Sequence, residues 1–203
     1  MLRVGLTGGV ACGKSTVGAM LAQRGAHFLQ ADTLAHELYL PGTVTYHAIT
    51  RSFGREILNE DGTINRAKLA NVVFPHRVAE LNAIVHPAVI EAQNRWLDEA
   101  ERDNPQGIAV VEAALLIEAG AAPHFDKVIV VTCDFEQKVA RYARRAGIAL
   151  EAARFEVERR SAAQSTDEEK ARHADYVIDN SGTPPEMEEQ VARIWAELVA
   201  SRG

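Results

Sequence analysis

The residues with the clearest chemical potential lie between Gly8 and Ser15, where the chain reads Gly-Gly-Val-Ala-Cys-Gly-Lys-Ser. Gly8, Gly13, Lys14 and Ser15 fill every fixed position of the pattern G-x-x-x-x-G-K-[ST]. Glycines let the backbone turn without a Cβ in the way, so that its N–H groups can surround phosphate oxygens. A lysine adds a mobile positive charge, and a serine hydroxyl can ligate Mg²⁺. The segment therefore predicts a loop that binds the polyphosphate of a nucleotide.

The elements on either side of this loop are those that a phosphate-binding loop requires. An apolar strand is expected over 2–7, and a helix from Lys14 to about Arg24. The helix N-terminus would add its positive dipole to the phosphate site. The alternative, a glycine-rich turn with an exposed lysine, requires the fixed residue types to have met by chance, which is rare. The expected nucleotide contacts here are Gly8, Gly9, Ala11, Cys12, Gly13, Lys14, Ser15 and Thr16.

Strands and helices alternate along the rest of the chain. Short apolar runs bounded by glycine, proline or charged residues are typical of a parallel sheet buried on both faces. Helices are expected between them, one from about Glu136 to Arg145 and a last one from near Pro185. This alternation predicts an α/β, three-layer P-loop fold with right-handed crossovers. Five parallel strands are expected, at 2–7, 27–31, 108–112, 128–132 and 176–178.

One long segment departs from this alternation because it is mostly helical. Its apolar residues repeat at helical spacing, and Pro87 is expected to break it into separate helices. We interpret this segment as a substrate-binding insertion, and a charged stretch further on as a lid that closes over the nucleotide. The expected parts are a single domain 1–203 with its core at 1–32 and 108–203, the insertion at 33–107 and the lid at about 141–172.

The composition is typical of a soluble globular protein. The 203 residues are 47% hydrophobic and 25% charged, and no apolar run approaches the roughly 20 residues of a membrane span. No signal peptide is recognisable, so we expect a cytoplasmic location without membrane association. The net charge of −6 argues against broad nucleic-acid binding. Cys12 and Cys133 form no Cys/His cluster and so indicate neither zinc nor a disulfide framework.

Basic residues concentrate in one part of this acidic chain. Nine of the 22 Lys and Arg residues fall between Lys138 and Arg172, where we expect phosphate contacts. Arg141 and Arg145 lie four residues apart and share one helix face. Arginines there could close over ATP and stabilise charge on the transferred phosphoryl group. The alternative is a solvated helix face, since Arg144 lies in the same run.

Among P-loop proteins, the chain fits best with a small-molecule kinase. A GTPase would normally carry a guanine-reading N-K-x-D motif, which is absent, and a motor or transporter ATPase would need a longer chain. A nucleotide-binding regulator without turnover is a further alternative. Intact Lys14, Ser15 and Asp32 argue against that alternative, because a protein without turnover has no physical need for all three.

An ordered set of short motifs extends over nearly the whole chain. It includes Gly5-Leu6-Thr7-Gly8-Gly9-Val10, Ala31-Asp32, Asn65-Arg66, His86-Pro87 and Asn180 with Gly182. In this order the motifs resemble the dephospho-CoA kinase family, which phosphorylates the ribose 3′-hydroxyl of dephospho-CoA. The resemblance implies ATP and Mg²⁺ as cofactors, dephospho-CoA as the small-molecule substrate and CoA as the product, in the last step of coenzyme A biosynthesis. Another small-molecule or nucleoside monophosphate kinase of this fold is the alternative.

The chain departs from that family at three positions. It has Gln30 where the family often has Asp, Ala114 where Pro is usual, and Lys138 where Gln is common. None of the three coincides with a residue that is expected to bind phosphate.

The resemblance also suggests roles for single residues. Asp32, at the end of the second strand, is the candidate base for the ribose hydroxyl, or an indirect Mg²⁺ ligand; a helix N-cap is the alternative. His86 and Arg66 are candidate contacts to the acceptor, although each could have a local structural role. Asn180 could contact the adenine edge, or it could be a turn residue.

Two further expectations concern Cys12 and assembly. Cys12 lies beside a helix N-terminus and Lys14, which both lower a thiol pKa, so we hypothesise that it is alkylated in the free enzyme and protected by ATP. The alternative is a small residue that fills the loop. A monomer or small homo-oligomer is expected.

Overall fold

The computed structural model describes residues 1–202 and divides the chain into two compact units. The core unit consists of residues 1–30 and 100–202, and the insertion unit consists of Ala31–Glu99. Each unit has a buried apolar cluster of its own. The sequence predicted an insertion at 33–107. The insertion unit begins two residues earlier, at Ala31, and ends eight residues earlier, at Glu99.

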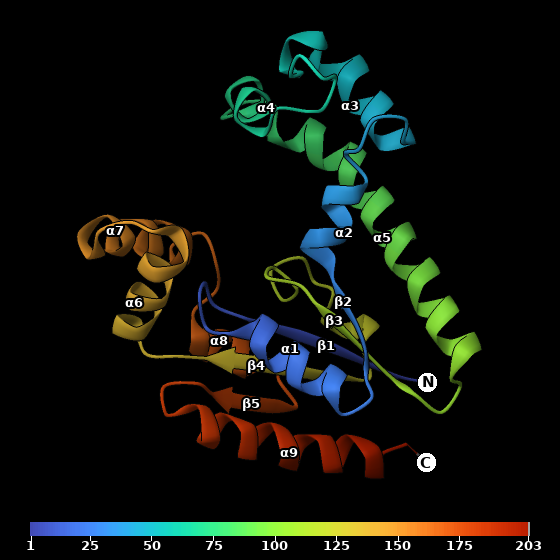
Figure 1. The fold of residues 1–203 in the computed structure, drawn as a ribbon. Coiled ribbons are helices and arrows are strands. Elements are labelled where there is room, and N and C mark those ends of the chain that lie inside the picture. Colours follow the sequence, from blue (N-terminus) through green and yellow to red (C-terminus); the bar gives the residue numbers. More distant parts are fainter. Residues whose placement is uncertain (203) are drawn as a thin grey trace. The chain divides into compact units, whose positions relative to one another are not determined.

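The core unit is built on a sheet of five parallel strands in the order β2-β3-β1-β4-β5 (Figure 1). The predicted α/β fold with five parallel strands is thus confirmed. No strand end differs by more than one residue from the expected one. The strands are β1 (Leu2–Gly8), β2 (His27–Gln30), β3 (Ile108–Glu112), β4 (Lys127–Thr132) and β5 (Tyr176–Asp179).

Helices follow most strands of the core unit, as the alternating pattern predicted. The helix after β1 begins at Lys14, and the last helix begins at Pro184 with a capping box between Thr183 and Glu186. Gly147 ends the helix after β4 in the left-handed conformation. The helices are α1 (Lys14–Gln23), η2 (Ala122–His124), α6 (Phe135–Ala146), α7 (Leu150–Ser161), α8 (Asp167–Ala171) and α9 (Pro184–Ala200).

Both faces of the sheet are covered, which explains why its strands are apolar runs rather than alternating ones. Val4 and Leu6 of β1 belong to the largest buried cluster, together with residues of α1 and α9. Val128 and Val130 of β4 are buried on the opposite face, where Leu116 packs against them. In Figure 1, α1 and α9 lie on one side of the sheet and α8 on the other. The core unit is therefore a three-layer structure.

The insertion unit is helical around a small core of Ile49, Phe53, Ile57, Leu69, Val73 and Val85. The expected break at Pro87 is wrong, because Pro87 lies inside one long helix. A proline there removes one backbone hydrogen bond, but the apolar face on either side of it packs on the unit's core. The elements are α2 (Ala31–Glu37), α3 (Val44–Phe53), η1 (Arg55–Ile57), α4 (Arg66–Val73) and α5 (Val78–Asp103), whose last residues belong to the core unit.

Candidate functional site

The loop between β1 and α1 has a backbone that two glycines make possible. Gly8 has φ 151°, and a Cβ there would lie 2.1 Å from the carbonyl oxygen of Val131. Gly13 has φ 95°, and a Cβ there would lie 2.3 Å from Nδ2 of Asn180. Either substitution would force backbone or a buried side chain to move. The two glycines of the sequence pattern are therefore required by the close packing of this loop as well as by its turn.

Lys14 holds the ends of the loop together. Its Nζ donates to the carbonyl oxygens of Gly8, at 3.2 Å, and Gly9, at 2.9 Å. Lys14 is also the first residue of α1, so its charge and the positive end of the helix dipole act at the same place. The loop therefore has a backbone cradle and a cation, the two parts that bind an anionic polyphosphate.

Ser15 contacts a carboxylate that the sequence analysis did not assign. Its Oγ donates to Oε1 of Glu112 at 3.1 Å, and Nε2 of Gln30 donates to Oε2 of Glu112 at 3.0 Å. The strand register explains this arrangement, because Glu112 is paired with Leu6 of β1 on one side and with Gln30 of β2 on the other. A hydroxyl and a carboxylate thus converge at the carboxyl end of the sheet.

Glu112 could have been found from the sequence. It is the last residue of a predicted buried strand, and ligands of open parallel sheets bind outside the carboxyl ends of the strands. The contact with Glu112 also explains how the chain accommodates Gln30, because the Gln30 amide donates to the Glu112 carboxylate. The Asp that is common in the resembled family would instead place a second carboxylate beside Glu112.

Arg141 and Asn180 are brought together at the carbonyl of Cys12. Asn180 is buried, and its Nδ2 donates to the Cys12 oxygen at 2.8 Å. Nη1 of Arg141 lies 3.5 Å from the same oxygen, and its Nη2 donates to the backbone oxygen of Asn180 at 2.9 Å. These contacts tie the end of β5 and the middle of α6 to the phosphate loop. Arg141 therefore lies against the loop, anchored by Asn180.

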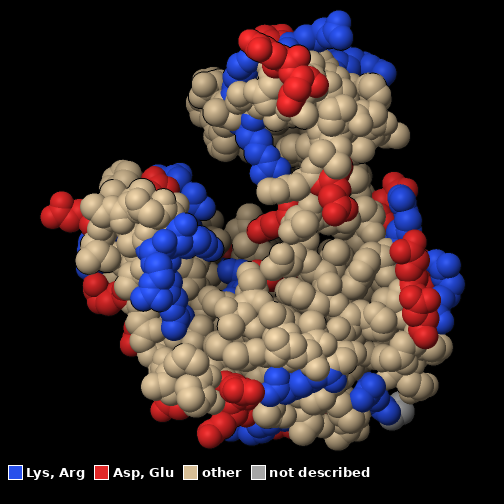
Figure 2. All heavy atoms as spheres, viewed as in Figure 1, with Lys and Arg blue, Asp and Glu red and all other residues tan. Residues whose placement is uncertain are grey.

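Arg145 lies one helical turn further on α6 and is exposed. Its guanidinium carbon stands 5.4 Å from the centroid of the Tyr142 ring, and that of Arg160 on α7 stands 5.3 Å from the same ring. Figure 2 shows basic side chains gathered on the part of the molecule that α6 and α7 form. Because these cations are exposed, they remain available to a ligand.

The helix pair α6–α7 also packs on the phosphate loop. Val10 is buried in a cluster with Val139 and Tyr142 of α6 and with Ala153 and Val157 of α7. The candidate lid is therefore in direct apolar contact with the loop.

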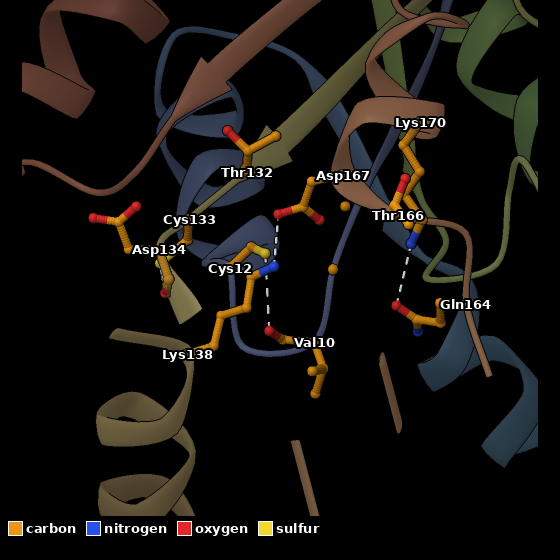
Figure 3. A network of polar contacts seen from close by, with 12 residues as sticks. Val10, Cys12, Thr132, Cys133, Asp134, Lys138, Gln164, Thr166, Asp167 and Lys170 are labelled. Atoms are coloured by element: carbon orange, nitrogen blue, oxygen red, sulfur yellow. Dashed lines mark hydrogen bonds and ion pairs between the residues drawn. The ribbon is translucent and has the colours of Figure 1, made fainter. Parts of the chain in front are cut away.

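Cys12 does not have the lowered pKa that its position suggested. The side chain is fully buried, and burial raises the pKa of the thiol to about 11, against the opposing effects of Lys138 and Lys14. The sequence-based hypothesis neglected desolvation, which outweighs the nearby cations. The Sγ atom points to the carbonyl oxygen of Val10, at 3.8 Å, within the loop (Figure 3). Cys12 therefore fills the loop interior, and its raised pKa argues against the hypothesised alkylation.

The insertion unit has a cavity of about 370 Å³ with a polar edge. Asp32, His36 and Arg66 line it, together with apolar residues such as Leu69 and Val73. Nη1 of Arg66 lies 2.5 Å from Nε2 of His36. The Arg66 guanidinium carbon also stands 5.8 Å from the centroid of the Tyr39 ring. Burial raises the pKa of Tyr39, while Arg66 acts in the opposite direction.

The structure brings two of the three predicted acceptor residues into this cavity. Asp32 and Arg66 line it, whereas His86 is an exposed residue of α5 and is not among the lining residues. Asp32 lies in the first turn of α2, one residue inside the helix, where a negative charge is favoured by the helix dipole. His36, which no expectation had assigned a role, is the additional polar group.

A parallel sheet of this order, whose first strand runs through a glycine-rich loop into a helix that begins with lysine and serine, defines a P-loop kinase. A crystal structure of a Thermus thermophilus protein is similar over 97% of both chains, with a TM-score of 0.79 and 31% identity. A dephospho-CoA kinase from Campylobacter jejuni has the same fold, with a TM-score of 0.62 over 97% of this chain and 96% of its own, at 24% identity.

The sequence comparisons identify the family. The family model described as dephospho-CoA kinase matches residues 2–186. A dephospho-CoA kinase from Geobacter metallireducens is 46% identical over 201 residues, which are 98% of each chain. The chain therefore belongs to the dephospho-CoA kinase family, as the ordered motifs predicted. Among residues 1–202, no helix is both long and apolar enough to cross a membrane.

Proposed function

We propose that this chain transfers the γ-phosphoryl group of ATP to the ribose 3′-hydroxyl of dephospho-CoA, which gives ADP and CoA. Family membership supports this reaction. The structural observation that carries the proposal is the complete phosphate loop, in which the Lys14 amine donates to the carbonyl oxygens of Gly8 and Gly9. Such a transfer needs little covalent chemistry from the protein. It needs ATP and acceptor held in line, charge neutralised and a proton removed.

The nucleotide end of the reaction is assigned to the core unit. The contacts proposed for the ATP phosphates are Gly8, Gly9, Ala11, Cys12, Gly13, Lys14, Ser15 and Thr16. Backbone N–H groups of the loop and the start of α1 would hold the β-phosphate, and Lys14 would exchange its carbonyl partners for phosphate oxygens. Lys14 then stabilises the charge that develops during transfer.

Ser15 and Glu112 are the residues that would hold Mg²⁺. Their side-chain oxygens lie 3.1 Å apart, and hydroxyl and carboxylate oxygens are hard ligands that suit this ion. No group of three His, Cys, Asp or Glu residues in the described part of the chain could hold a metal, so phosphate oxygens and water would complete the shell. When bound, Mg²⁺ neutralises charge on the phosphates.

The acceptor end is assigned to the insertion unit. Asp32 would accept the proton of the ribose hydroxyl, and Arg66 would bind a phosphate of dephospho-CoA from the edge of the cavity. His36 supports Arg66 through the contact between their nitrogens. His86 remains a proposed contact at the surface of α5, outside the lining of this cavity.

The helices α6 to α8 are proposed to act as the lid at about 141–172. Arg145 would reach the nucleotide phosphates when the lid closes, because it is exposed and stacks on Tyr142 near the surface of α6. Arg141 would stabilise the transferred group, or hold the loop through Cys12 as it does here. Asn180 is proposed to lie beside the adenine, at the end of β5.

A coupled assay of ADP release tests the proposal. Dephospho-CoA should be phosphorylated with MgATP, while nucleoside monophosphates, shikimate and free sugars should not. The product should carry the new phosphate on the 3′-hydroxyl, as read by ³¹P NMR. Turnover of a nucleoside monophosphate but not of dephospho-CoA would reject the proposed acceptor and retain only the kinase fold.

We also propose a cytoplasmic enzyme that is a monomer or small homo-oligomer and does not bind nucleic acid. The net charge of −6 supports the last point. Light scattering measures the assembly, and fractionation of cells that produce the protein measures the location. A membrane-bound pool or a large assembly would contradict these proposals.

A further inference from the structure

Lys138 is a buried cation beside the phosphate loop that the proposed mechanism does not use. It lies in the second turn of α6 and is 9% exposed. Its Nζ donates to Oδ2 of Asp167, the first residue of α8, at 2.6 Å (Figure 3). Burial disfavours the charged form of Lys138, but the hydrogen bond to Asp167 and the neighbouring Cys12 hold its pKa above the usual value. Lys138 and Asp167 therefore form a charged pair that is mostly shielded from water.

This ion pair rests directly on the phosphate loop. A Cβ added to Gly9 would lie 3.0 Å from Oδ1 of Asp167 and 3.2 Å from Nζ of Lys138. The distance from the same Cβ to the Sγ atom of Cys12 would also be 3.0 Å. In Figure 3 the Lys138 amine, the Asp167 carboxylate and the Cys12 thiol converge at one point. The backbone at Gly9 is therefore packed against both members of the pair.

The short helix that carries Asp167 is held firmly on its other side. Lys170 is fully buried, and its Nζ lies 3.2 Å from Oε1 of Glu118 and 3.1 Å from Oε1 of Gln164. Thr166 and Glu169 form a capping box that fixes the start of α8. Asp167 is thus a firmly placed group at the anchored, C-terminal end of the candidate lid.

We propose that the Lys138–Asp167 ion pair is a positioning device for the phosphate loop, which ties the affinity for ATP to the placement of α8. With the pair intact, the backbone at Gly9 is held in the conformation that presents the loop's N–H groups to the phosphates. Without the ion pair, the free loop adopts more conformations. ATP binding then has a larger cost in conformational entropy, and the affinity for ATP falls. The acceptor is bound by the insertion unit, so its binding is not affected.

The burial of the pair predicts an order among variants. Asp167→Asn leaves the Lys138 charge buried without a counter-charge and should be the most harmful. Lys138→Gln leaves a partly exposed carboxylate, which water can solvate, and should be milder. The double variant removes both charges, and its two amides can hydrogen-bond to each other.

The test measures the Kd of MgATP by calorimetry and the KM of each substrate for these variants. Asp167→Asn should weaken ATP binding roughly 10- to 30-fold and raise the KM for ATP to match, with the acceptor KM unchanged. The double variant should recover most of the loss. Lys127→Gln is the matched control, because Lys127 and Asp175 form a lysine–aspartate pair at 2.9 Å in the same unit, away from the loop.

Three results would overturn the proposal. One is a lowered melting temperature with the Kd for MgATP unchanged within about twofold, which would make the pair merely structural. The second is an equal rise of both KM values. The third is a double variant whose ATP binding is as weak as the two single losses combined. The proposal builds on ATP as the nucleotide but not on the identity of the acceptor. Calorimetry without acceptor therefore separates its failure from failure of the proposed function.

Discussion

We propose that the phosphate loop and the insertion cavity recognise anions by different means. The loop uses backbone groups whose geometry is fixed by packing, since Gly8 and Gly13 have no room for a Cβ. The cavity uses the exposed side chains of Asp32, His36 and Arg66, which are placed by two short helices. A triphosphate is common to many enzymes and suits a preformed backbone cradle, whereas an acceptor must be distinguished from its analogues by side chains. Substitutions in the loop should therefore damage catalysis most, and substitutions in the cavity should shift selectivity.

The largest effect is expected for Lys14→Ala. Removing the ammonium group leaves the phosphate charge uncompensated during transfer, so kcat should fall by about 10³-fold or more. Circular dichroism and the melting temperature should show an intact fold, and Lys127→Ala serves as a surface control. Retention of more than a tenth of the activity would contradict the role given to Lys14.

Asp32→Asn should have the next largest effect. The amide cannot accept the ribose proton, so kcat should fall by about 10²- to 10⁴-fold, while the Kd of MgATP stays unchanged. Single-turnover kinetics would measure the chemical step directly. Full kcat in this variant would remove Asp32 as the base and leave it only a place in the first turn of α2.

Glu112→Gln should weaken Mg²⁺ rather than ATP itself. The concentration of Mg²⁺ needed for half-maximal activity should rise about 10- to 100-fold, because the carboxylate facing Ser15 is lost. Titration of activity with Mg²⁺ at saturating ATP measures this. Glu136→Gln is the control, because Glu136 lies on the exposed side of α6. Glu118→Gln is unsuitable, because Glu118 forms an ion pair with the buried Lys170. An unchanged Mg²⁺ requirement would exclude Glu112 from the metal site.

Arg66→Gln should act on the acceptor alone. We expect a rise of about tenfold in the KM for dephospho-CoA, with kcat and the KM for ATP nearly unchanged, because one charge-assisted contact is lost. The contrast with Lys14→Ala is the sharpest test of the division between the two regions. A rise in the KM for ATP of the same size would show that the division is incorrect.

The smallest effect is expected from thiol reagents. Because burial raises the pKa of Cys12 to about 11, almost no thiolate exists near neutral pH, and iodoacetamide should not label the native protein at pH 8. Mass spectrometry after unfolding supplies the positive control, since the exposed thiol should then react. Rapid labelling of native protein that ATP prevents would restore the original hypothesis.

Structural features that depend on residues close together in the sequence could be predicted, whereas contacts between residues far apart in the sequence could not. The strands, the helix stripes and the loop glycines were predictable because periodicity and turn chemistry are local. The end of a predicted strand pointed to Glu112, but its contact with Ser15 and the Lys138–Asp167 pair could not be predicted, because strand register and helix packing create them. Pro87 shows the converse, since tertiary packing keeps a helix intact through a residue that usually ends one. For Cys12, the neighbouring charges were visible in the sequence but the burial was not.

The hydrogen bond between Asn180 and the Cys12 carbonyl joins residues 168 positions apart. The loop precedes the other four strands of the sheet in sequence, yet one of its supports, Asn180, directly follows β5. Contacts of such sequence separation are slow to form, because the intervening chain must first be ordered. Nucleotide binding in this kinase therefore reports on the completion of folding, since the loop is not fully supported until the sheet has received β5.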